Sequence, residues 1–407
     1  MNAIRKFILL FSGAALLAAG SVQAKEASTL QVFMESLNIE LLDEVRLTLG
    51  QEFGYEDNVD ERPRSQRSGN WSTETKLDLV LSRAVDTTSL GLAAGVSYAH
   101  DFHKGENDDN KGLSYYISPL VDGTYKMGRH TFMLGGSSRY ESQELDRSNR
   151  TNVMTATNQI QGGWSMDLTG KTTLAVTADY KNIHYGDSKN DDYDRQVYGA
   201  KFAPYLNVSQ RTRLGVLAGI ERTEYVHHTL HDDSNRYTFG LYGYYTLTER
   251  TKVYAEGGAE RLAYQDGTIS SRDSQERYEP YFTLGASYAA SDSLLLSAKL
   301  ARSTEDSLAS DTRGNRSEYS ASFDAAWKVT GKMVLTNQFA FAYQDEKAGN
   351  ADENEYAYGL IVKYQATPTL RLSAGYLLTI GDYDNKVRSR RDYVDNEFRF
   401  GLSWEIL

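Results

Sequence analysis

The side chains best suited to chemistry gather in one polar segment, His227-His228-Thr229-Leu230-His231-Asp232-Asp233. Imidazole and carboxylate groups at this density are the ligand types that bind zinc or copper. A metal site also needs a strand or helix that holds its ligands at a fixed spacing, and this segment has neither period. We therefore favour a solvated loop, and we expect neither a bound metal nor another cofactor.

Acidic residues cluster in three further segments: Asn107-Asp108-Asp109-Asn110, Asn190-Asp191-Asp192 and Asp352-Glu353-Asn354-Glu355. Their oxygen ligands would suit calcium, or divalent cations that bridge lipopolysaccharide. The twelve-residue pattern of a calcium-binding loop is absent from all of them. The favoured interpretation is a set of solvated, mutually repelling loops.

A His-Asp pair occurs in His100-Asp101-Phe102-His103. Some outer-membrane proteases and lipases place such groups at the rim of a small barrel, beside a nucleophile. No nucleophile is identifiable near this pair, and a chain without cysteine excludes thiolate chemistry. We therefore predict that the protein is not an enzyme.

The elements that carry these segments are strands, because large apolar residues recur at every second position from about Glu44 onwards. Residues 214–220 are typical, with Leu, Val, Ala and Ile separated by Gly and Leu, and residues 294–300 repeat the pattern. We count about eighteen such segments. Each is predicted to be a strand with one apolar and one polar face.

The connections also alternate between short turns such as Thr330-Gly331-Lys332 and long segments such as 56–71, with nine long and eight short. This order predicts an all-β fold, a transmembrane antiparallel up-and-down β-barrel of about 18 strands, with short periplasmic turns and long extracellular loops. The alternative is a soluble secreted sandwich, whose loop lengths are not ordered in this way.

The polar faces carry charges of both signs. The predicted pore-lining residues are Lys76, Asp78, Asp122, Asp179, Lys181, Lys201, Glu256, Glu279, Lys299, Asp324, Lys363, Arg371 and Arg399. The same face carries tyrosines that would offer stacking surfaces to sugar rings: Tyr116, Tyr205, Tyr242, Tyr244, Tyr254 and Tyr281. A barrel of this strand number leaves an aqueous channel. The alternative is a structural network inside the barrel, and the sequence leaves both open.

The two ends of the chain fit an exported barrel. Residues 1–24 are predicted to be a secretory signal peptide, residues 25–43 a periplasmic leader and residues 44–407 the transmembrane barrel. The last strand resembles the C-terminal signal by which outer-membrane barrels are recognised for insertion, carried here by Arg399, Gly401, Trp404 and Ile406. Such signals usually end on an aromatic residue, whereas this chain ends on Ile406 and Leu407.

The first hairpin resembles the opening of a family of β-barrel porins, some of which occur in exopolysaccharide systems. The resemblance is carried by the pentad Tyr55-Glu56-Asp57-Asn58-Val59, at the end of the first predicted strand. It implies an outer-membrane pore, and polysaccharide export as a more specific role. The balanced charge of the predicted lining argues against a conduit for polyanions.

Taken together, the sequence predicts a Gram-negative outer-membrane channel for hydrophilic solutes, with saccharides as candidate cargo. Exopolysaccharide export is one alternative, and a non-conducting scaffold or adhesin that displays its loops is another. The expected partners are outer-membrane lipid, lipopolysaccharide and the barrel assembly machinery. The net charge of -11 argues against nucleic acid. The oligomeric state stays open.

Overall fold

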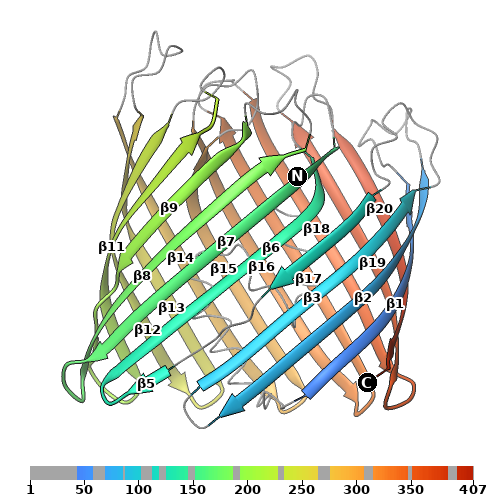
Figure 1. The fold of residues 1–407 in the computed structure, drawn as a ribbon, viewed down its shortest axis with the longest axis horizontal. Helices are drawn as coiled ribbons and strands as arrows, with labels where there is room; N and C mark the ends of the chain where they lie inside the picture. The colour runs from blue at the N-terminus through green and yellow to red at the C-terminus, as the bar shows by residue number, and fades with distance from the viewer. Residues whose placement is uncertain are drawn as a thin grey trace.

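The alternating segments form a single antiparallel sheet that is rolled into a barrel in this computed structural model (Figure 1). The structure describes residues 44–57, 69–85, 88–101, 112–118, 125–144, 152–186, 193–227, 233–264, 276–306, 315–346, 351–383 and 392–406. Within these ranges no helix is long and apolar enough to cross a membrane. The predicted signal peptide and leader, and Asp122, lie outside the described residues.

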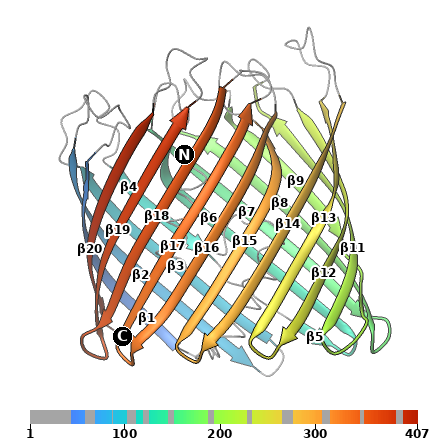
Figure 2. The ribbon, with the colours of Figure 1, turned by 180° about the vertical axis from the view of Figure 1, so that it is seen from behind.

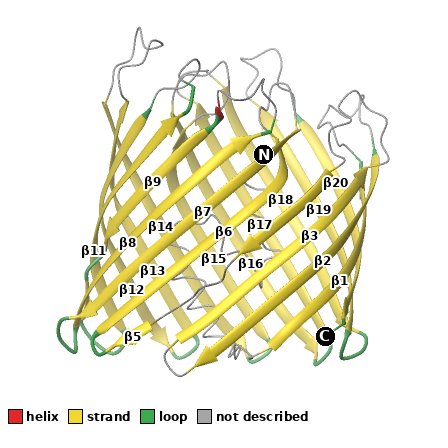
Figure 3. Ribbon diagram, in the orientation of Figure 1, coloured by secondary structure: helices red, strands yellow, loops and turns green. Residues whose placement is uncertain are grey.

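The first half of the barrel consists of β1 (Glu44–Glu56), β2 (Asn70–Val85), β3 (Thr88–Asp101), β4 (Gly112–Ser118), β5 (Tyr125–Met127), β6 (His130–Glu144), β7 (Asn152–Asp167), β8 (Thr172–Tyr185), β9 (Arg195–Phe202) and β10 (Tyr205–Asn207). The second half consists of β11 (Thr212–Tyr225), β12 (Ser234–Thr248), β13 (Thr251–Tyr264), β14 (Glu276–Ser291), β15 (Leu294–Asp306), β16 (Asn315–Thr330), β17 (Met333–Glu346), β18 (Ala351–Gln365), β19 (Leu370–Tyr383) and β20 (Tyr393–Glu405). Figures 2 and 3 show that strands form the described wall, with short green turns between them at one end.

The predicted strand number is confirmed, because two pairs of short strands each make one crossing. β4 and β5 both pair with β6, and β9 and β10 both pair with β8 and β11. The strands therefore make eighteen crossings. The alternation of connections is confirmed as well: residues 331–332 join β16 to β17, whereas residues 265–275 separate β13 from β14.

The break between β9 and β10 falls at Ala203 and Pro204, where the sequence predicts one continuous strand. Proline has no N–H to donate to the neighbouring strand, so a ladder of hydrogen bonds is interrupted there. The adjoining groups still pair, since Ala203 N donates to Ala175 O at 2.8 Å and Val216 N donates to Pro204 O at 3.1 Å. The interruption is therefore local, and the wall remains continuous.

One predicted loop is wrong. The acidic run of residues 352–355 lies inside β18, where Asp352 pairs with Asp345 of β17. The two strands extend to Glu346 and Ala351, so the connection between them is only residues 347–350. Composition suggested a solvated loop, but continued pairing with β17 extends the strand.

The first and last strands close the barrel. β1 and β20 pair from Thr48 with Glu405 to Glu56 with Glu397. Beyond the last pair, Asp57 clips the two strands together: its backbone N–H donates to Asn396 O at 2.9 Å, and its carboxylate accepts from Asn396 N and Nδ2, both at 2.8 Å. Closure pairs the two edge strands with each other. Strands in lipid require this pairing, because an unpaired edge would leave backbone polar groups without hydrogen bonds.

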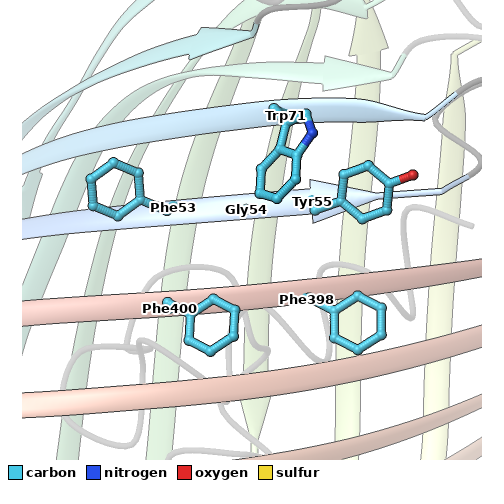
Figure 4. A pocket seen from close by; sticks show the side chains of 6 residues that line it. All are labelled: Phe53, Gly54, Tyr55, Trp71, Phe398 and Phe400. Atoms are coloured by element: carbon cyan, nitrogen blue, oxygen red, sulfur yellow. The ribbon is translucent and has the colours of Figure 1, made fainter.

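The outer face of the barrel is an exposed apolar belt. Phe239 is 65% exposed, Leu241 62% and Trp71 60%. A water-soluble protein would bury such a continuous belt of large apolar side chains in its core. At the seam between β20, β1 and β2, this belt includes a groove lined by Phe53, Gly54, Tyr55, Trp71, Phe398 and Phe400 (Figure 4). The aromatic rings of the groove stand on the apolar side of the wall. The groove is therefore part of the lipid-facing surface and separate from the lumen.

Candidate functional site: the inner wall of the barrel

The polar residues that alternate with the belt face the interior. The structure places twelve of the predicted pore-lining residues on strands, each next to outward-facing residues: Lys76, Asp78, Asp179, Lys181, Lys201, Glu256, Glu279, Lys299, Asp324, Lys363, Arg371 and Arg399. Arg399, for example, stands between Phe398 and Phe400, which are 41% and 59% exposed. These twelve residues thus share the polar side of the barrel wall.

Two of these residues, Lys76 and Arg399, meet in an ionic network at the seam. Lys76 Nζ lies 2.8 Å from Glu74 and 3.5 Å from Glu52. Arg399 bridges Glu52 at 3.3 Å and Glu397 at 2.6 Å. Every charge of this seam network, which comprises Glu52, Glu74, Lys76, Glu397 and Arg399, has an opposite partner on β1, β2 or β20. Its side chains thus bind one another across the closing strands.

Glu279 has a partner that the sequence did not suggest. Arg302 Nη2 lies 2.7 Å from its carboxylate, and Arg302 Nε donates to Tyr319 Oη at 3.1 Å. Arg302 falls at the apolar positions of β15, two residues after Leu300, so alternation alone predicts it on the outer face. It is nevertheless buried. No sequence signal separates it from a lipid-facing arginine, because the partner residues come from neighbouring strands.

Five of the predicted tyrosines come together on β10, β12, β13 and β14. The ring centroids of Tyr244 and Tyr254 are 4.7 Å apart, and those of Tyr242 and Tyr244 are 6.1 Å apart at nearly a right angle. Tyr205 lies on β10, and Tyr281 lies on β14. We call these five residues the tyrosine wall. The side chain of Tyr116, on β4, is not among those that the structure describes.

Glycines make room for the rings of the tyrosine wall. A Cβ atom on Gly215 would lie 2.3 Å from Tyr242 Cζ, and one on Gly240 would lie 2.1 Å from Tyr281 Oη. The Tyr242 ring therefore lies across the backbone of the adjacent strand β11, and the Tyr281 ring reaches past Gly258 of β13 to β12. Tyr242 Oη donates to Ala203 O at 2.9 Å, so the strand break at Ala203 receives a hydrogen bond from the wall. These contacts fix the rings in place.

Glu256 lies beneath this surface. It is 6% exposed, and it accepts a hydrogen bond from Tyr254 Oη. Burying a carboxylate requires polar partners, and the hydroxyl of Tyr254 supplies one of them. Glu256 thus acts first as an anchor for the tyrosine ring, whereas the sequence indicated only that it faces the interior.

Arg213 completes the wall and was not among the predicted residues. Its guanidinium lies 4.4 Å from the Tyr205 ring centroid and 5.9 Å from that of Tyr244. Its Nε donates to Asn207 Oδ1 at 3.3 Å. The alternation of residues 214–220 places Arg213 on the inner face, which was the signal available in the sequence. Its contacts with Tyr205 and Tyr244 depend on the register of β10, β11 and β12, which the sequence alone does not specify.

Most of the loop segments with candidate metal ligands lie outside the described residues. Most of the histidine-rich segment, residues 228–232, lies outside the described residues, as do Phe102 and His103. Across the described ranges, no group of three or more histidine, aspartate or glutamate side chains is arranged to hold a metal ion. The candidate site is therefore the inner wall.

Comparison of the sequence with protein-family models and with curated proteins finds no match. Solved structures with a similar fold include OccK2 (OpdF) of Pseudomonas aeruginosa, at 12% identity and a TM-score of 0.50, with coverage of 90% of this chain and 99% of that one. OccK2 in complex with glucuronate has 11% identity, a TM-score of 0.48 and the same coverage. A BenF-like porin of Pseudomonas fluorescens Pf-5 has 12% identity and a TM-score of 0.48, over 89% of this chain and 98% of that one.

At 12% identity and a TM-score of 0.50, the likeness to OccK2 shows the fold alone. A closed antiparallel barrel with an exposed apolar belt is the form that spans the bacterial outer membrane, because every backbone group is paired within the wall. The predicted outer-membrane location follows from this architecture. The chain has the fold of an outer-membrane β-barrel porin.

Proposed function

We propose that the protein is a channel through which hydrophilic solutes, saccharides in particular, cross the outer membrane. The observation that carries the proposal is the tyrosine wall, an aromatic surface on the interior of an eighteen-crossing barrel. Barrels of about 16 to 18 strands leave an aqueous lumen, so this surface would meet solutes in transit.

Aromatic rings on a lumen wall suit sugars for a physical reason. The C–H groups on one face of a sugar ring form an apolar patch that packs on a tyrosine ring, while the hydroxyls remain free to hydrogen-bond with water and polar side chains. Tyr205, Tyr242, Tyr244 and Tyr254 lie on three crossings that are close together in the wall, since Tyr242 and Tyr244 share β12. A saccharide could pass from ring to ring without being trapped, because each contact is weak.

The twelve described pore-lining residues are proposed to contribute the polar part of the lining. Outer-membrane lipid and lipopolysaccharide are the proposed surroundings of the belt. The barrel assembly machinery is proposed to recognise the last strand, in which Trp404 and Ile406 are exposed on the lipid side. Exopolysaccharide export and a non-conducting scaffold are the competing roles, and conductance measurements separate them from passive solute uptake.

The test is single-channel conductance of the refolded protein in a planar bilayer, with neutral oligosaccharides added on one side. We expect a steady conductance that the sugar reduces in a concentration-dependent manner. A folded barrel that carries no current would favour the scaffold. A current that only long polysaccharide chains reduce would favour export.

A further inference from the structure

We propose that the outer face of β6 to β11 binds the headgroup of an outer-leaflet glycolipid, a phosphorylated glucosamine disaccharide of the lipid A type. This surface is on the lipid-facing side of the wall, so its role does not depend on the channel function proposed above. It combines amide donors with an arginine, and both kinds of group bind phosphate and sugar oxygens.

A row of polar side chains crosses five strands of the outer face. Cross-strand pairing joins its members in turn, from β6 through β7, β8 and β9 to β11, and we call them the polar row: Ser138, Asn158, Asn182, Gln196 and Glu224. Ile160, which is 59% exposed, lies two positions from Asn158 on the same side of β7. The polar row therefore lies on the lipid-facing side of the wall, at the extracellular edge of the apolar belt.

The strands across the barrel are apolar at the same level (Figures 1 and 2). Asn182 is the eleventh residue of β8, counted from its periplasmic end, and Arg222 is the eleventh of β11. The eleventh residues of β17 and β19 are Tyr343 and Ile380. Ile380 is 37% exposed, and Tyr356, its partner in β18, is 42% exposed. Hydrocarbon can contact these residues, whereas amides at the same level need a polar ligand.

The polar row presents hydrogen-bond donors. Ser138 Oγ donates to Asn158 Oδ1 at 2.7 Å, and Tyr198 Oη donates to Gln196 Oε1 at 2.6 Å. Each bond uses the carbonyl oxygen of an amide, which leaves the NH2 group of that amide without a partner among the described residues. Asn182, between them, likewise has no side-chain hydrogen bond within the described ranges. These three amides can therefore donate to a ligand.

Arg222 adds a positive charge just below the polar row. It pairs with Tyr198 across β9 and β11, and its side chain is 45% exposed. Its Nη2 lies 2.7 Å from Glu224, the last member of the row. A guanidinium has five N–H donors, so one carboxylate contact leaves others for a phosphate. The ring centroids of Tyr180 and Tyr198 are 5.2 Å apart, and tyrosines of this kind mark the boundary between hydrocarbon and headgroups.

These groups match a phosphorylated disaccharide. Its phosphate would contact Arg222, while its hydroxyl and amide oxygens would accept hydrogen bonds from the three amides of the polar row. Its acyl chains would continue over Ile160 and Ile220, which are 59% and 45% exposed on the belt below. The proposed site is thus continuous with the lipid-facing surface. A phosphatidylcholine headgroup offers the amides no sugar oxygens and brings a second cation close to Arg222.

The experiment titrates the refolded protein in detergent micelles with lipid A, and native mass spectrometry counts the lipid molecules bound to each barrel. We expect one lipid A molecule to bind the wild type at lower concentration than any further one. Removal of both phosphates from the lipid should raise its half-saturating concentration about three- to tenfold, as the loss of one partly solvated ionic contact would give.

Four variants test the residues. Arg222→Ala should raise the half-saturating concentration of lipid A about three- to tenfold and make it insensitive to removal of the phosphates. Glu224→Gln should lower it about twofold, because the carboxylate competes with the phosphate for Arg222. Asn182→Leu should raise it about twofold through the loss of one donor. Arg250→Ala should leave it unchanged. Arg250 is a matched control, since it is an exposed arginine with a carboxylate partner, Asp292, at the periplasmic end of the barrel.

The opposite effects of Arg222→Ala and Glu224→Gln distinguish a ligand site from a structural ion pair, which both substitutions would disrupt alike. Equal weakening by these two variants would overturn the inference, as would equal weakening by Arg222→Ala and Arg250→Ala, or wild-type binding that does not depend on the phosphates. Sedimentation of the same samples tests a second copy of the chain as the occupant: a dimer that Arg222→Ala dissociates would overturn the lipid assignment. Conductance bears on the channel alone, so the two proposals can fail separately.

Discussion

The tyrosine wall and the seam network lie far apart on the barrel, with β11 to β13 at one side of Figure 1 and β1, β2 and β20 at the other. At the seam, Arg399 and Lys76 are held by three glutamates. At the tyrosine wall, Arg213 is held by aromatic rings and a single amide. Charges that neutralise one another stabilise a wall, whereas rings and a neutral amide hold a charge in place without neutralising it.

The comparison predicts that stability depends most on the seam. Arg399→Ala leaves Glu52 and Glu397 without their shared partner on strands that must close the barrel. We expect the free energy of unfolding to fall by about 2 kcal/mol, less than for a fully buried pair because the arginine is partly solvated. Urea titration of the refolded protein in detergent micelles, followed by tryptophan fluorescence, measures it. Arg399→Lys should lose less of the free energy of unfolding than Arg399→Ala. If Arg399→Ala is as stable as the wild type, the seam network contributes no more to stability than the tyrosine wall does.

A smaller loss is expected at the clip beyond the seam. Asp57→Ala removes the two hydrogen bonds from Asn396 to the carboxylate but keeps the backbone bond. The expected cost is about 1 kcal/mol. When samples are heated to increasing temperatures before gel electrophoresis, the temperature at which the folded band converts to the unfolded band should fall accordingly. Asp57→Asn retains one acceptor, so its conversion temperature should lie between those of the wild type and Asp57→Ala. If Asp57→Ala converts at the same temperature as the wild type, the Asp57–Asn396 hydrogen bonds contribute nothing to closure.

At the tyrosine wall, substitutions should alter solute binding more than stability. Tyr244→Ala removes the ring between Arg213 and Tyr254. We expect the half-blocking concentration of a neutral oligosaccharide to rise about threefold to tenfold, as the loss of one aromatic contact would give. The matched control is Tyr278→Ala, which removes a ring that is 69% exposed on the outer face. Equal effects of the two substitutions would show that the block does not involve the wall.

The smallest effect should come from Arg371. Its pair with Glu405 is solvent-exposed, with the arginine side chain 46% exposed. Arg371→Ala should therefore change the free energy of unfolding by about 0.5 kcal/mol or less in the same urea titration. A loss as large as that of Arg399→Ala would mean that the periplasmic end of β19 is also part of the closing seam.

Much of this architecture could be predicted from the sequence. Side chains alternate with a period of two along any strand, so the run from Leu294 to Leu300 shows its lipid-facing side without knowledge of its neighbours. Glycine in short links such as residues 330–332, and proline in residues 367–369, mark the turns. Strand number, fold class and the inward position of residues such as Lys76 follow from these local rules.

The partners of each side chain could not be predicted in the same way. Arg302 reaches Glu279 from a position that alternation assigns to lipid, and Asp352 continues a strand where composition suggests a loop. Both outcomes depend on the register with a neighbouring strand. Register is a property of a pair of strands, and neither strand specifies it alone.

The sequence by itself thus determined that the chain forms strands, that each strand has a lipid-facing and an inner side, and that about eighteen of them alternate in direction, because period and turn chemistry are local. Only the tertiary structure decided that Asp57 meets Asn396 across the closing seam and that Arg213 stands among tyrosines while Arg371 meets Glu405. The physical reason is that these contacts join residues of different strands. Their meeting depends on register and closure of the whole barrel.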